Sequence, residues 1–185
     1  MMFPGQGAQY TGMILEELLL NKNSKLLLKE ASETLGLDVV DMCNNPEKKH
    51  LLDSTAFSQP CIFAASMARI AAYMSDDIGT HPLSVNKPTI ALGLSLGEYS
   101  ALCYAGVFSF ADGMMLTSAR GQAMQRACDI RPGKMTAVVG MPWSRLEALC
   151  TSVETQTGQI ARIGNYLSPG SSVLAGGCSQ MRCGV

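Results

Sequence analysis

The chain has 185 residues, of which 47% are apolar and 16% charged, and its formal net charge is −1 at pH 7. This composition is typical of a globular chain with a buried core and excludes an intrinsically disordered one. The charge gives no support for nucleic-acid binding. No apolar stretch reaches the roughly 18 uninterrupted residues of a membrane span. We therefore expect neither nucleic acid nor membrane as a partner.

The numbers of cysteines and histidines limit the kinds of site that the chain can form. The seven cysteines are odd in number and form no Cys-x-x-Cys pair, which favours free thiols in a reducing compartment. The only histidines are His50 and His81, so we predict no zinc site and no other metal site. The N-terminal residues contain neither a secretory signal nor an Arg-rich transit segment.

The first motif along the chain is Phe3-Pro4-Gly5-Gln6-Gly7. Glycines on both sides of Gln6 let the backbone turn tightly and direct N–H groups into a cavity. The alternative is an ordinary Pro-Gly turn, and this segment alone favours that alternative.

Helical patterns dominate the first two thirds of the chain. The pattern at 60–74 is the longest before the central motif, and its apolar face recurs with a period near 3.6, which indicates a core helix opened by Gln59-Pro60. A polar loop is predicted at 76–87. The other predicted helices cover residues 11–20, 25–35, 46–52, 99–105 and 110–128.

The central motif is Gly93-Leu94-Ser95-Leu96-Gly97-Glu98, which follows the apolar run 89–92 and precedes a helical pattern. Strand, sharp turn and helix are the setting in which Gly-x-Ser-x-Gly forms a nucleophile elbow. The flanking glycines remove Cβ atoms that would collide where strand and helix approach. Ser95 is the predicted nucleophile. The alternative is a glycine-rich turn that carries an ordinary surface serine.

The last part of the chain has a different pattern. Residues 131–134 are predicted to form a hinge, and short strands at 135–139, 159–165 and 172–175 surround a predicted helix at 143–150. This order is typical of a small α+β module. We therefore divide the chain into a larger subdomain, 1–132, and a smaller one, 133–185.

Four segments occur in an order that closely resembles malonyl-CoA:acyl-carrier-protein transacylases, especially the mitochondrial enzymes of animals. They are 3–7, 93–98, Arg120 and 165–170, and the Gln59-Pro60 pair matches as well. The resemblance covers nearly the whole chain. It implies an α/β fold, in which an α/β-hydrolase-like parallel-sheet subdomain with a nucleophile elbow is joined to a partial ferredoxin-like α+β subdomain.

The resemblance also implies a reaction and its residues. Ser95 would take malonate from malonyl-CoA as an ester and pass it to acyl carrier protein, in type II fatty-acid synthesis. The N–H groups of Gln6 and Leu96 would form the oxyanion hole, and Arg120 would bind the free carboxylate. Asn165 would line the cleft between the subdomains. The family needs no cofactor beyond the phosphopantetheine of its substrates, and we expect a monomer in the mitochondrial matrix, or otherwise the cytoplasm.

The chain departs from the family pattern at its ends. The histidine that serves the family as general base lies far downstream of the serine, whereas His50 and His81 both precede Ser95. We expect the strand that leads into Phe3 to be missing. We therefore expect a chain that is incomplete at both ends relative to the family, with uncertain activity of its own.

Two other functions fit the same residues. A serine hydrolase would use the same elbow, but a carboxylate anchor such as Arg120 has no use in a simple esterase. A non-catalytic protein that binds acyl groups or carrier protein would need no general base.

Overall fold

The computed structural model describes residues 1–75 and 88–177. The predicted loop at 76–87, with His81, lies outside the described residues. The chain separates into two compact units, Met1–Gln125 and Arg126–Val185, so the division falls inside a helix rather than at the predicted hinge.

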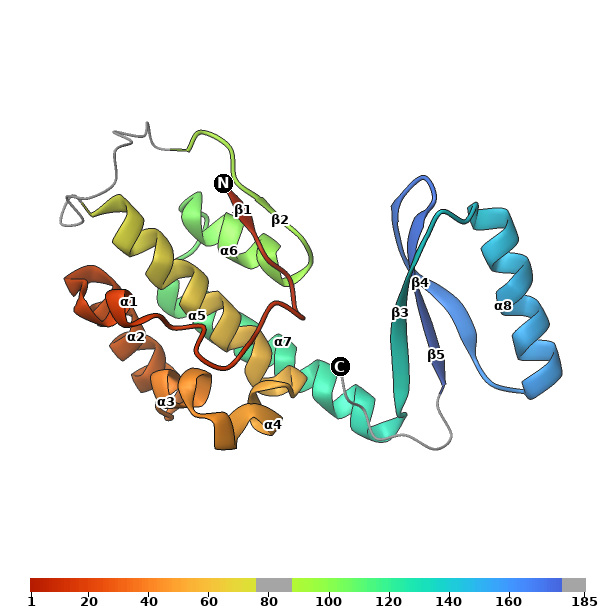
Figure 1. Cartoon of the computed structure of the whole chain (residues 1–185), viewed down its shortest axis with the longest axis horizontal. Helices are drawn as coiled ribbons and strands as arrows, with labels where there is room; N and C mark the ends of the chain where they lie inside the picture. The colour runs from red at the N-terminus through yellow and green to blue at the C-terminus, as the bar shows by residue number, and fades with distance from the viewer. Residues whose placement is uncertain (76–87, 178–185) are drawn as a thin grey trace. The chain divides into compact units, whose positions relative to one another are not determined.

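The first unit consists of helices around a short pair of strands (Figure 1). Its core centres on the longest helix of the N-terminal part, α5, where Phe63 is fully buried and stacks on the ring of Phe110. The elements, in chain order, are β1 (Met2–Phe3), α1 (Glu16–Leu20), α2 (Lys22–Leu35), α3 (Val39–Asn44), the 3₁₀ helix η1 (Pro46–Lys48), α4 (Lys49–Leu52), α5 (Thr55–Met74), β2 (Leu92–Gly93), α6 (Leu96–Tyr104) and α7 (Phe110–Ile130).

The strand expected to be missing before Phe3 is present, although it is only two residues long. β1 pairs in parallel with β2, Met2 opposite Leu92 and Phe3 opposite Gly93. Burial of the Phe3 side chain holds this short strand in place, since 6% of the residue is exposed. Helices and a parallel pair in one unit confirm the predicted α/β class.

Helix α5 begins at Thr55, before the predicted start at Gln59-Pro60. A proline six residues into a helix removes the N–H that would bond to the carbonyl four residues earlier, here that of Ala56, and its ring crowds the same carbonyl. The backbone of Gly121 lies against this turn: a Cβ built there would be 2.6 Å from the Thr55 carbonyl oxygen. Helices α5 and α7 thus approach closely where the proline interrupts the helical bonds.

The second unit is a three-stranded antiparallel sheet with one helix. Its elements are β3 (Gly133–Val139), α8 (Trp143–Thr157), β4 (Ala161–Ser168) and β5 (Ser171–Gly177), and the strand order is β3-β5-β4. Leu146 of α8 is buried, and Trp143 packs edge-on against Tyr166 of β4. This β-α-β-β order matches the first four of the six elements of a ferredoxin-like unit.

Helix α8 continues to Thr157, well past the predicted end at Cys150. The added turns are rich in threonine, a residue of low helix propensity. Each threonine hydroxyl donates to the carbonyl four residues earlier, and Gly158 then ends the helix in the left-handed conformation. The hydroxyl donors are Thr151, Thr155 and Thr157.

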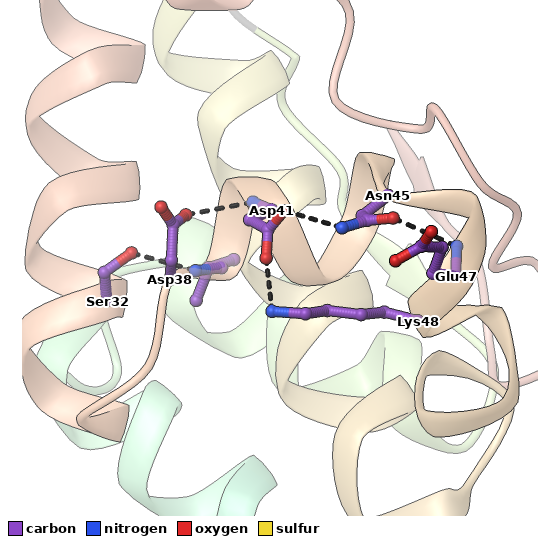
Figure 2. A network of polar contacts seen from close by, with 7 residues as sticks. Ser32, Asp38, Asp41, Asn45, Glu47 and Lys48 are labelled. Carbon is purple, nitrogen blue, oxygen red and sulfur yellow. Dashed lines mark hydrogen bonds and ion pairs between the residues drawn. The ribbon is translucent and has the colours of Figure 1, made fainter.

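A polar network fixes the ends of α3 and η1 (Figure 2). Asp38 caps α3 by accepting the N–H of Asp41 at 2.9 Å. Lys48 and Asn45 both donate to the Asp41 carboxylate and hold its pKa below the usual value. The network is explained by helix capping, and we assign it no functional role.

Replacing Asn21 with alanine should destabilise the first unit. Asn21 is buried, caps α2 by accepting the N–H groups of Asn23 and Ser24, and donates to the hydroxyl of Ser75 at 2.7 Å. Loss of the cap and of a buried partner predicts a decrease of about 1–2 kcal/mol in unfolding free energy. Urea unfolding followed by circular dichroism measures it, with the exposed Asn23→Ala as control; equal effects of the two variants would contradict this.

Candidate active site

Ser95 occupies a strained turn between β2 and α6. Its φ of 51° and ψ of −103° make it the one non-glycine residue with positive φ among those the structure describes. Neighbouring glycines permit the turn: a Cβ on Gly93 would lie 2.0 Å from the carbonyl carbon of Gly97. The Ser95 residue itself is exposed. This is the geometry of a nucleophile elbow, where strain persists because the surroundings enforce it.

The segment around Gln6 lies directly against this elbow. A Cβ on Gly5 would be 2.8 Å from the carbonyl oxygen of Leu94, and one on Gly97 would be 2.4 Å from that of Phe3. Leu96 is the first residue of α6, where backbone N–H groups have no partner within the helix. Leu96 thus follows Ser95 directly in the chain, and the segment that contains Gln6 packs against the turn that carries Ser95. That the N–H groups of Gln6 and Leu96 form the oxyanion hole stays a prediction.

Arg120 reaches Ser95 from α7. Its Nη2 donates to the Ser95 hydroxyl oxygen at 2.8 Å, and its guanidinium carbon lies 5.6 Å from the centre of the Tyr99 ring. The residue is half-buried. A guanidinium in contact with a nucleophilic oxygen is also within reach of a carboxylate on a short acyl group bound to that oxygen.

Two residues on the first turns of α5 support the site, and the sequence reasoning assigned them no role. Thr55 accepts a hydrogen bond from the Gln6 side chain at 2.8 Å. Gln59, which is fully buried, accepts one from Nη1 of Arg120. They are four residues apart and thus lie on one face of the helix. A glutamine inside an apolar helical face was the available signal, because buried amides need partners.

Three further residues were considered for a role in the site. Asn165 is an exposed residue of the second unit, on β4, next to a register irregularity after Ile163, and its place in the site stays a prediction. His50 is exposed on α4, and its Nδ1 lies 3.0 Å from the Glu47 carbonyl oxygen. Burial raises the pKa of Cys103, on α6, to about 11, so this thiol is not an alternative nucleophile near neutral pH.

Neither the cavity in the first unit nor a metal-binding group among the described residues adds to the site around Ser95. A cavity of about 320 Å³ in the first unit is lined by β1 and α5, and neither Ser95 nor Arg120 borders it. Within residues 1–75 and 88–177, no group of three His, Cys, Asp or Glu side chains is placed to hold a metal ion. Nor does any helix in these ranges have the length and apolar character required to cross a membrane.

A serine on a strained strand-to-helix turn, with a guanidinium on its hydroxyl, defines a site for acyl transfer through a serine ester. The chain belongs to the acyl transferase family, whose model, described as acyl transferase domain, matches residues 1–159.

Individual relatives give a more specific comparison than the family model. The chain is 31% identical over 183 residues to the mitochondrial malonyl-CoA-acyl carrier protein transacylase of Mus musculus, covering 95% of this chain and 46% of that protein. The crystal structure of the malonyl CoA-acyl carrier protein transacylase from Clostridium perfringens is 38% identical and matches with a TM-score of 0.76, covering 95% of this chain and 52% of that one.

A third match is a malonyl-transacylase solved in complex with its type II PKS acyl-carrier protein. It is 34% identical, with a TM-score of 0.74, over 95% of this chain and 54% of that one. The chain thus spans about half the length of the relatives it matches. These likenesses confirm the resemblance and the α/β fold predicted from the sequence.

Proposed function

We propose that this chain carries the nucleophile and the carboxylate anchor of an acyl-carrier-protein S-malonyltransferase of type II fatty-acid synthesis. The observation that supports this most directly is the 2.8 Å hydrogen bond from Arg120 to the hydroxyl of Ser95. An esterase for neutral acyl groups has no need of a guanidinium at this position, whereas a malonyl ester on Ser95 ends in a carboxylate.

The proposed reaction has two half-reactions. The Ser95 oxygen attacks the thioester carbonyl of malonyl-CoA, an O–C bond forms, the C–S bond breaks, and coenzyme A leaves as the thiol. The thiol of acyl carrier protein then attacks the ester carbonyl, an S–C bond forms, the C–O bond to Ser95 breaks, and the thiol proton ends on the Ser95 oxygen, which restores the hydroxyl. Negative charge develops on the carbonyl oxygen each time, and the N–H groups of Gln6 and Leu96 would stabilise it. We assign no proton-accepting role to His50, the one histidine among the described residues, because it lies on α4 with its Nδ1 3.0 Å from the Glu47 carbonyl oxygen.

Partners and location follow from the same proposal. The substrates would be malonyl-CoA and acyl carrier protein, supported by the malonyl-transacylase complex, and the protein would need no cofactor of its own beyond their phosphopantetheine. The mitochondrial relative supports a place in the mitochondrial matrix. We propose a monomer in solution. Fractionation of the source cells and light scattering of the purified chain test these two statements.

Removing the Arg120 side chain should lower malonylation selectively. We expect Arg120→Ala to reduce the malonyl ester on Ser95 about 100-fold, because a charge-assisted, two-bond contact with the carboxylate is lost, while acetyl ester formation changes little. Arg120→Lys should recover only part of the loss. Intact-protein mass spectrometry after incubation with equal malonyl-CoA and acetyl-CoA measures both esters. The exposed Arg126→Ala on the same helix is the control.

Adding acyl carrier protein to the same incubation and measuring free malonate separates the alternatives. Malonylation that survives Arg120→Ala unchanged would contradict the proposal. Release of free malonate without transfer to acyl carrier protein would indicate a hydrolase. A stable ester with no transfer would indicate a protein that binds the acyl group without turnover.

A further inference from the structure

Gln59 is a polar side chain inside the core, and both ends of its amide are used. It has no exposed surface. Its Oε1 accepts a hydrogen bond from Nη1 of Arg120, and its Nε2 donates to the sulfur of Met124 at 3.2 Å. A buried amide is costly unless it is bonded, so its contact with Arg120 is favourable to both residues.

Three contacts fix the Arg120 guanidinium. Nη1 binds Gln59, Nη2 binds Ser95, and the ring of Tyr99 lies beneath the guanidinium carbon. Ser95 is the partner that must change its bonding when it becomes acylated. Gln59 is buried and keeps its position. It therefore holds the Arg120 guanidinium in place through Nη1, while Nη2 changes its partner from the Ser95 hydroxyl to the substrate.

The chemistry of an amide suits this task. A carboxylate at position 59 would accept the same hydrogen bond but would also neutralise the guanidinium. The amide orients Arg120 and leaves its positive charge available to a second anion. A charge held in a fixed direction beside Ser95 favours acyl groups that end in a carboxylate.

We propose that Gln59 is a positioning residue that sets acyl-group preference, by holding Arg120 in line with Ser95 without neutralising it. This inference rests on the proposed function. It predicts that the ratio of malonyl to acetyl ester on Ser95 falls when the side chain at position 59 loses its hydrogen-bond acceptor. The ratio should also fall when that side chain becomes charged.

Two substitutions test the two requirements. Gln59→Met keeps the volume and removes the acceptor, and Gln59→Glu keeps the acceptor and adds a charge. We expect each to lower the malonyl-to-acetyl ester ratio on Ser95 about tenfold or more, in competition with equal concentrations of the two thioesters. The control is Gln122→Met, an exposed glutamine on α7 that should keep the wild-type ratio. In an Arg120→Ala background, neither Gln59 variant should change the ratio further.

The outcomes separate the inference from the proposed function. A wild-type chain that takes no malonyl group contradicts the proposed function. A selective wild type whose Gln59 variants keep the same ratio, with only lower stability, overturns the inference alone. If Gln59→Met does not fold, Gln59→Glu decides. Nitrogen-15 NMR of the wild type adds a test without any Gln59 variant. We expect separate signals for the two Nη atoms of Arg120, identified by their absence in Arg120→Ala. One averaged signal for the two atoms overturns the inference.

Discussion

Replacing Ser95 with alanine should abolish covalent labelling by malonyl-CoA, and replacing it with glycine should abolish labelling and also stabilise the protein. Both variants lack the nucleophilic oxygen. They differ in the backbone: Ser95 has φ 51° and ψ −103°, which a residue with a Cβ adopts only under strain. Alanine keeps that strain, whereas glycine relieves it, so we expect Ser95→Gly to unfold with about 1 kcal/mol more free energy than Ser95→Ala.

The matched pair makes this prediction specific. Mass spectrometry after incubation with malonyl-CoA should show no adduct on either variant, and urea unfolding should rank Ser95→Gly above Ser95→Ala. An adduct that persists in Ser95→Ala would mean that another residue is the nucleophile. Equal stability of the two variants would mean that the turn stores no strain. The expected result would show that the strained turn lowers the stability of the protein while it exposes the Ser95 hydroxyl.

The sequence was sufficient for the elbow because its determinants are local. Gly93, Ser95 and Gly97 are within five residues, and both glycines have a steric reason to be where they are. The contact between Ser95 and Arg120 is different, since the two residues are 25 positions apart, one in the turn before α6 and the other on α7. Periodicity and spacing do not encode that distance, and only the resemblance to the family pointed to Arg120. The supporting contacts of Thr55 and Gln59 depend on how α5 packs, which no local pattern reveals.

The same distinction explains the fold. The end of α2 was predictable because Gly36 alone specifies the left-handed cap. The true start of α5 was not, because Pro60 signals a helix start locally while tertiary packing with Gly121 extends the helix backwards. Helix α8 continues past Cys150 although threonine hydroxyls bond to its own backbone there, an effect that slightly destabilises a helix, and it ends only at Gly158 in the left-handed conformation.

Replacing Gly93 with alanine should disrupt the elbow more than any other single methyl group in this turn. The new Cβ would lie 2.0 Å from the carbonyl carbon of Gly97 and 2.4 Å from the backbone nitrogen of Glu98, where no side chain can move aside. Strand and helix must separate, so we expect a loss of about 3 kcal/mol or more in unfolding free energy. Labelling of Ser95 should disappear as well, because the turn that presents its oxygen is displaced.

Gly12→Ala is the control that separates collision from backbone strain. Gly12 has φ +87° and open space around its Cβ position, so alanine there adds strain without a collision and should cost about 1 kcal/mol. Urea unfolding compares the two variants, and labelling by malonyl-CoA should survive in Gly12→Ala alone. If Gly93→Ala were as stable as Gly12→Ala and still labelled, the close approach of β2 and α6 would not be what holds Ser95 in place, and the physical basis of the elbow would have to lie elsewhere.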